Sequence, residues 1–122
     1  MLPIPFHITH WEQIRATEHR GEKGIATWRT ISYNDLRIRV VDYSPGYLAD
    51  HWCERGHIIF CLEGDMTTEL KDGRTFELKA GMSYEVSDNM SSHRTFSENG
   101  AKLFIVDGGF LNIGVVHAKA RR

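Results

Sequence analysis

The sequence predicts an all-β fold, a sandwich or a barrel, on two observations. From Ile25 onward, short runs rich in apolar and β-branched residues recur about every 8–12 residues, as in antiparallel sandwiches and barrels. Turn-forming residues separate these runs, and no long stretch shows helical periodicity. With 122 residues, the chain has the length of one domain, which we assign to residues 1–122 with its core motifs at 25–107.

Eight runs have the length and composition of strands. They span residues 25–31, 36–43, 57–62, 66–70, 75–78, 83–86, 93–97 and 102–106. Asp72-Gly73 predicts a two-residue type I′ hairpin turn, because that turn requires positive φ at both central positions. Residues 58–62 are apolar on both faces, so we expect the barrel to cover one face and another strand or subunit the other.

The two ends of the chain differ from the core. In the N-terminal extension, residues 1–24, Thr9 and Glu12 have the spacing of a capping box, which predicts a short helical turn over about residues 10–15. Residues 17–24 are polar with two glycines and indicate a loop. Residues 108–122 form a C-terminal arm, in which residues 111–116 are either a last strand or an ordered arm.

Composition excludes several classes of partner. Fifteen basic and sixteen acidic residues give a formal charge of −1, so no field of one sign draws the chain to nucleic acid or an anionic membrane. The longest apolar run is too short to span a bilayer, and the first residues do not resemble a signal peptide. We therefore expect a cytoplasmic protein whose cysteines, Cys53 and Cys61, are reduced.

Four potential metal ligands are His51, Cys53, His57 and His93. His51 and Cys53 are two positions apart, so in a strand they point to the same side. His57 follows a glycine where the chain can bend back, and His93 follows two predicted hairpins. Imidazole and thiolate are good ligands for zinc, iron, nickel and copper. Spacing alone leaves two alternatives, a metal site inside the barrel or surface histidines with a core cysteine.

The stretch from Gly46 to His93 resembles the two linked motifs of the cupin superfamily. Gly64 matches the closing glycine of the first motif, which puts His51-x-Cys53 at its His-x-His pair and His57 at its glutamate. In the second motif the turn, the glycine corner and the last ligand are matched by Asp72-Gly73, Ala80-Gly81 and His93. The resemblance implies a cupin fold, the double-stranded β-helix or jelly-roll barrel. It also implies one divalent metal on His51, Cys53, His57 and His93.

A narrower resemblance explains the two changed ligands. Asp50-His51-Trp52-Cys53, with its flanking motifs over about residues 5–107, is similar to the small proteins called DHCW-motif cupins. The His/Cys/His pattern then belongs to the subfamily. A ligand set of three histidines and one cysteine is softer than one of three histidines and a glutamate. It therefore favours zinc or iron(II), with nickel or copper as alternatives. Cupin relatives are commonly homodimers, so the resemblance also implies a homodimer.

Four further side chains were assigned to the surroundings of the site, each with an alternative. Asp50 either accepts a hydrogen bond from a ligand imidazole or lies on the surface. Tyr84 lines the pocket mouth or is a core aromatic. Arg37 and Arg39 either hold an anionic substrate or form a solvated strand face, and we favour the solvated face.

Three functions fit these residues. The first is a metal-dependent enzyme, of dioxygenase or isomerase type by analogy of fold, acting on a small polar molecule. The second is a non-catalytic module that binds or senses a small molecule. The third is a structural zinc site closed by all four ligands. The residue types do not identify a substrate.

Overall fold

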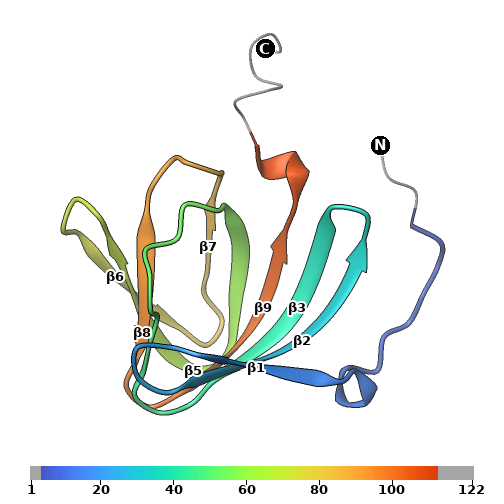
Figure 1. Cartoon of the computed structure of the whole chain (residues 1–122), viewed down its shortest axis with the longest axis horizontal. Coiled ribbons are helices and arrows are strands. Elements are labelled where there is room, and N and C mark those ends of the chain that lie inside the picture. The colour runs from blue at the N-terminus through green and yellow to red at the C-terminus, as the bar shows by residue number, and fades with distance from the viewer. Residues whose placement is uncertain (1–3, 113–122) are drawn as a thin grey trace, which may run out of the picture.

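The computed structural model describes residues 4–112 and shows a strongly curled antiparallel sheet (Figure 1). Within these residues nine strands and two short 3₁₀ turns alternate with tight connections. The strands in chain order are β1 (Ala16–Arg20), β2 (Ile25–Tyr33), β3 (Leu36–Tyr43), β4 (Tyr47–Leu48), β5 (His57–Leu70), β6 (Thr75–Lys79), β7 (Ser83–Val86), β8 (His93–Ser97) and β9 (Ala101–Asp107). The 3₁₀ turns are η1 (Trp11–Gln13) and η2 (Gly109–Leu111). The all-β prediction is therefore confirmed.

Strand β5 belongs to both halves of the curled sheet. The strand order is β1-β2-β3-β9-β5-β8-β4, and β6 and β7 also pair with β5. The first part of β5 pairs with β7 and β9, and its second part pairs with β6 and β8. A bulge between Cys61 and Glu63 lies just before the end of the pairing with β9 at Gly64, and the pairing with β6 begins at Asp65. Bulges bend a strand and increase its twist, so here one strand leaves one sheet and enters the other.

The prediction of two separate strands at residues 57–62 and 66–70 was wrong, because one strand bends between them without ending. Gly64 lies in the bend with φ of +76°, and the carbonyl oxygen of Gly100 approaches so closely that no Cβ would fit. Glycine combines that φ with that close approach at little steric cost. Gly64 therefore allows β5 to continue from the β9 side to the β8 side of the curl.

Inward-facing side chains form the core on the concave side of the sheet. Period-two alternation places Val41 on β3, Leu103 on β9 and Cys61 on β5 in one cross-strand row, and all three are buried. The next inward row is Arg39, Ile105 and Ile59. The buried cluster as a whole consists of Ala26, Val41, Ile59, Cys61, Met66, Leu78, Ala101, Leu103 and Ile105. Val41, Ile59 and Ile105 of this core also line the cavity described below.

The N-terminal segment differs from the prediction in two respects. Residues 17–24 were predicted as a loop, but Ala16–Arg20 form strand β1 along the edge of β2. Polar side chains are tolerated there because β1 is an edge strand with an open outer side. The helical turn is confined to Trp11–Gln13, and its N-cap is His10 without a side-chain hydrogen bond, so the Thr9 capping box does not form.

The predicted hairpin at Asp72-Gly73 forms with a different turn. Leu70 and Arg74 close the β5–β6 hairpin, and of the two turn residues only Gly73 has positive φ, +97°. A type I turn followed by a left-handed glycine is the usual three-residue alternative to type I′. In the C-terminal arm, Gly109–Leu111 form η2, and residues 113–116 of the predicted 111–116 element lie outside the described residues.

The outer face of β5 is not covered by another strand of the described chain. Ile58, Phe60 and Leu62 are 37–40% exposed, whereas Ile59 and Cys61 between them are buried. Residues 58–62 were expected to be covered on both faces, and within the described residues only their inner face is buried. In residues 4–112 no helix has the length and apolar character needed to cross a membrane.

The bend at Gly64 gives a test of the fold. Gly64→Ala would put a methyl group against the Gly100 carbonyl, and we expect it to lower the free energy of unfolding by at least ~3 kcal/mol. Gly73→Ala is the matched control, since Gly73 also has positive φ but open space around it, and we expect a cost of about 1 kcal/mol. Urea denaturation of both variants measures the difference, and equal costs would contradict the role of the bend.

Candidate metal centre

A cavity of about 230 Å³ opens on the concave side of the sheet. Its walls combine aromatic and aliphatic side chains with histidine, cysteine and arginine. The residues that line it are Trp28, Arg37, Arg39, Val41, Tyr43, Tyr47, Ala49, His51, Cys53, Arg55, His57, Ile59, Tyr84, His93, Arg94, Thr95 and Ile105. All four predicted ligands, and all the predicted surrounding residues except Asp50, therefore lie on one cavity.

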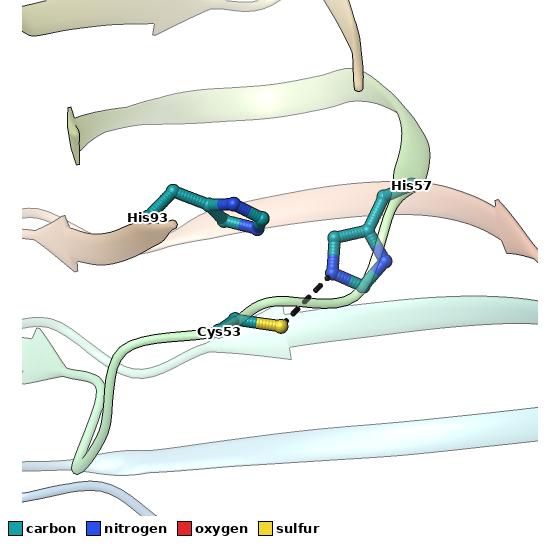
Figure 2. A group of neighbouring side chains, drawn as sticks. All are labelled: Cys53, His57 and His93. Atoms are coloured by element: carbon teal, nitrogen blue, oxygen red, sulfur yellow. Dashed lines mark hydrogen bonds between the residues drawn. The ribbon is translucent and has the colours of Figure 1, made fainter. Parts of the chain in front are cut away.

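Three of the predicted ligands meet in this cavity wall. Ligand atoms of Cys53, His57 and His93 all lie within 4.8 Å of one another (Figure 2). Cys53 Sγ is 3.6 Å from His57 Nε2. The backbones of Cys53 and His93 form an isolated β-bridge, with N···O distances of 2.7 and 3.0 Å, so hydrogen bonds fix Cys53 beside β8. His57 is the first residue of β5, directly after the bend that follows Cys53.

The His93 ring is held with one nitrogen free. Its Nδ1 is 2.9 Å from the carbonyl oxygen of Ser91. A carbonyl only accepts, so Nδ1 carries the proton and donates it, and Nε2 keeps its lone pair. His93 is 4% exposed, and among the described residues its buried Nε2 has no hydrogen-bond partner. Buried polar atoms are normally satisfied, so this nitrogen is poised for a ligand.

The His57 ring is held in the same way by a carboxylate. His57 Nδ1 is 3.0 Å from Asp107 Oδ2, at the end of β9. The carboxylate accepts from Nδ1–H, which leaves Nε2 turned toward Cys53. Burial alone would lower the pKa of His57, but Asp107 and Cys53 raise it above its ordinary value. A carboxylate behind an imidazole is the usual support of a metal-binding histidine.

Asp107 is the centre of a larger buried network that the sequence analysis missed. It is fully buried, and Arg37 contacts it with Nε at 3.0 Å and Nη2 at 3.1 Å. Arg39 Nη2 donates to the same carboxylate at 2.9 Å. Burial opposes the charge of Asp107, yet His57, Arg37 and Arg39 hold its pKa well below the usual range. Alternation from the inward Leu103 and Ile105 would have placed Asp107 inside the barrel.

The arginines of β3 are not a solvated strand face, which corrects the preferred sequence-based interpretation. Arg39 is 4% exposed and its guanidinium lies 4.3 Å from the centre of the Trp28 ring. Arg37 lies 5.4 Å from the same ring and is partly exposed. Both side chains pair across the sheet with inward residues of β9, Asp107 and Ile105. Side chains two positions apart in a strand point to the same face, so Arg37 and Arg39 share the inward face of β3 with the buried Val41.

The two cysteines differ in environment. Burial alone would raise the pKa of Cys53, but the imidazoles of His57 and His93 lower it to about 5. A lowered pKa favours the thiolate, which is the form that binds metals. Cys61 is fully buried in the core, and burial raises the pKa of its thiol. Both are free cysteines, and only Cys53 lies in the donor group.

His51 lies outside the three-donor group. Its Nδ1 is 2.6 Å from Asp50 Oδ1, and the two side chains are 73% and 58% exposed. Asp50 therefore does contact a predicted ligand imidazole, but at the solvent-exposed rim of the cavity. That His51 is a ligand stays a prediction. Tyr84 both packs against the core and lines the cavity, and the centre of its ring lies 6.1 Å from the centre of the His93 ring.

The donor set fits a metal ion. Two imidazoles with their second nitrogens anchored, and one thiolate, converge from two strands and a loop. Zinc and iron bind these atom types at about 2.0–2.3 Å, which brings donors about as close together as the Cys53–His57 pair already is. The unpartnered nitrogen of His93 is explained if it binds such an ion. Cys53, His57 and His93 thus form a group that could hold a metal.

The comparison with known structures places the fold among the cupins. Ectoine synthase from P. lautus aligns with a TM-score of 0.69 and 17% identity over 84% of this chain and 78% of that one. An RmlC-like cupin from Shewanella frigidimarina aligns with a TM-score of 0.66 and 18% identity, over 85% and 91%. FeII HppE aligns with a TM-score of 0.68 and 15% identity over 88% of this chain, which spans 63% of that protein. No family model and no curated protein matches the chain.

These likenesses show that the chain has the cupin fold, as the sequence motifs predicted. At 15–18% identity they carry the fold and not the activity. The geometry described above, and not the comparison, supports the candidate metal centre.

The buried network around Asp107 gives a second test. Asp107→Asn removes the charge that offsets two arginines, and we expect it to lower the free energy of unfolding by about 3 kcal/mol in chelator-treated protein. Because the pKa of Asp107 is depressed, its stabilisation is complete above the ordinary carboxyl pKa of about 3.9 and is lost as the pH falls below it. Denaturation at pH 7 and pH 3 should show the difference shrinking.

The control is Asp72→Asn, which removes an exposed carboxylate that also contacts an arginine, Arg74. Exposed ion pairs contribute little, so its stability should stay close to that of the wild type. An Asp107→Asn variant as stable as Asp72→Asn would show that the network is not important for folding.

Proposed function

We propose that this protein is a metal-dependent cupin enzyme that acts on a small polar molecule, with one divalent ion on Cys53, His57 and His93. The observation that carries the proposal is the convergence of these donors in the wall of a cavity, where the buried Nε2 of His93 lacks a partner. A metal held there would supply a Lewis-acid position that faces the cavity. The protein's own residues would orient the ligands and form a partly enclosed binding space.

The number of donors favours an open centre over a structural one. Catalytic zinc sites characteristically have three protein ligands, whereas structural zinc sites have four. A closed site would require His51 to leave Asp50 and turn inward from a position where its side chain is 73% exposed. The structure therefore supports the enzyme more than the closed zinc site. A binding or sensor module shares the same geometry, and turnover distinguishes the two.

Zinc or iron(II) suits the donor set best in this proposal. Thiolate and imidazole together select the later or softer divalent metals over manganese or magnesium. One of the structural neighbours is named as an Fe(II) protein. Nickel and copper remain compatible with the same atoms. Metal analysis is thus part of the test below.

The subfamily and the compartment are also proposals. The Asp50-His51-Trp52-Cys53 motif supports assignment to the DHCW-motif cupins. Within this motif, Cys53 belongs to the donor group and His51 lies at the exposed rim of the cavity, which supports a role for Cys53 as a ligand. The cytoplasm is proposed because two free cysteines suit a reducing compartment.

The outer face of β5 supports a homodimer as a further proposal. Ile58, Phe60 and Leu62 form a row that is 37–40% exposed on a strand whose inner residues are buried. Phe104 of the neighbouring β9 extends the row, although Trp11 packs edge-to-face on it at 6.2 Å. A second copy of the chain would cover these residues, as the interface of a symmetric dimer.

Metal content tests the proposed function. The purified full chain, reconstituted and washed, should hold about one equivalent of zinc or iron by elemental analysis. Cys53→Ser should weaken binding by roughly tenfold or more, because it removes a thiolate ligand. Cys61→Ser is the matched control, since Cys61 is a core residue outside the donor group, and its metal content should stay unchanged.

A His57→Ala/His93→Ala variant completes the set and should bind no metal. Equal metal content in the Cys53 and Cys61 variants would remove Cys53 from the ligand set. No metal in the wild type after reconstitution would favour a metal-free binding module.

Light scattering tests the dimer. The wild type should have the mass of two chains at micromolar concentration, and Phe60→Glu should shift it toward one chain, because a charge would be buried in the interface. Phe76→Glu, on β6, is the control and should leave the mass unchanged. A wild-type mass of one chain at every concentration would exclude the dimer.

A further inference from the structure

The charged side chains around the cavity are unbalanced. Among the described residues that line it, several are arginines and none is an aspartate or glutamate. Asp50 contacts His51 at the exposed rim and Glu69 contacts Arg94, whereas Asp107 is fully buried and shared by Arg37, Arg39 and His57. The guanidiniums of Arg37 and Arg39 therefore share a single carboxylate. Buried charges are normally paired, so the part of the wall around these two arginines has an excess of positive charge.

Arg39 shows this imbalance most clearly. It is 4% exposed, donates from Nη2 to Asp107, and its buried Nε has no hydrogen-bond partner among the described residues. Its other neighbours are the face of Trp28 and the guanidinium of Arg37. Burial and Arg37 lower the pKa of Arg39 despite the opposing effect of Asp107. Because Arg37 and Arg39 both line the cavity, an anion that enters it meets two neighbouring guanidiniums that share only one carboxylate.

The position of the arginines relates them to the metal centre. Arg37 pairs with Asp107 across β3 and β9, and Asp107 in turn contacts His57, so the arginines and the donor group are joined through one carboxylate. The cavity of about 230 Å³ contains both sets of side chains. Pockets for drug-sized ligands are usually about 300–1,000 Å³, so this cavity suits a compact molecule.

We propose that the cavity binds a small organic anion, with a carboxylate of the ligand at Arg37 and Arg39 and its other end facing Cys53, His57 and His93. This inference deepens the proposed function and rests on it for the second contact. A divalent ion on a single thiolate would add to the positive charge of the cavity, so a loaded centre favours an anion further. The planar fork of arginine matches the two oxygens of a carboxylate. Trp28 covers the guanidiniums from one side and restricts the approach of water.

Calorimetric titration with small diacids tests the inference. The metal-loaded full chain is titrated with oxalate, malonate, succinate and glutarate, and with the corresponding neutral diamides, at constant ionic strength. At least one diacid should bind about tenfold or more tightly than its diamide, because the diamide cannot form charge-assisted hydrogen bonds. Equal binding of every diacid and its diamide, or no binding of any diacid, overturns the proposal.

Variants assign the preference to the arginines. Arg39→Gln should reduce the affinity for the best diacid by about tenfold or more when it is compared with the wild type at equal metal occupancy. Arg74→Gln is the matched control, because Arg74 is an exposed arginine on the β5–β6 hairpin that also contacts an aspartate. It should leave the affinity unchanged. If Arg39→Gln does not fold by circular dichroism, Arg37→Gln takes its place with the same expectation.

The outcomes separate this inference from the proposed function. Metal binding with diacid affinity that neither arginine variant alters overturns the anion site and leaves the metal centre standing. Diacid binding that depends on Arg39 in a chain that takes up no metal upholds the anion site and overturns the metal enzyme.

Discussion

The structure depends most on the carboxylate of Asp107. It lies at the end of β9, is fully buried, and accepts hydrogen bonds from Arg37 and Arg39 on β3 and from His57 on β5. Three strands are thereby joined by side chains as well as by their backbone ladders. The same contacts favour the His57 tautomer with its proton on Nδ1, and they hold two guanidiniums inside the curled sheet. One carboxylate thus affects the stability of the fold, the orientation of the His57 ring and the charge of the cavity.

The bend of β5 brings together the residues of the candidate metal centre. Because β5 pairs first with β9 and then with β8, it carries His57 to the start of one sheet while its far end pairs with His93. The bridge between Cys53 and His93 then closes the loop that precedes β5. Residues that are up to 40 positions apart in the chain meet because one strand belongs to both sheets.

Local patterns predicted much of the fold. The bounds of β3 and β7 agree with the sequence prediction, because alternation within one strand is a local property. β1 was missed because its polar residues become a strand only through pairing with β2. The break predicted at Gly64 was wrong because glycine marks both turns and bends, and the partner strands decide which of the two forms.

The site was predictable to a similar extent. Motif spacing identified Cys53, His57 and His93, which converge in the structure, and His51, which lies outside their group. The inward orientation of Arg39 and the role of Asp107 depend on which face of β3 and β9 is concave, and that is a property of the whole sheet. Asp107 follows Leu103 and Ile105 at alternate positions of one strand, and all three are buried. A charged residue that continues such an apolar alternation can therefore be predicted to point inward.

A strand shared by both sheets has a consequence for how the chain opens. β5 is hydrogen bonded to β6, β7, β8 and β9, so neither sheet can separate without breaking its ladder. Edge strands such as β1 and β4 can fray, but amide protons in the middle of β5 become accessible only when the whole barrel opens. His57 on β5 and His93 on the neighbouring β8 are held by this ladder, and Cys53 is held by its bridge to His93. Opening of β5 therefore separates the donors of the candidate metal centre.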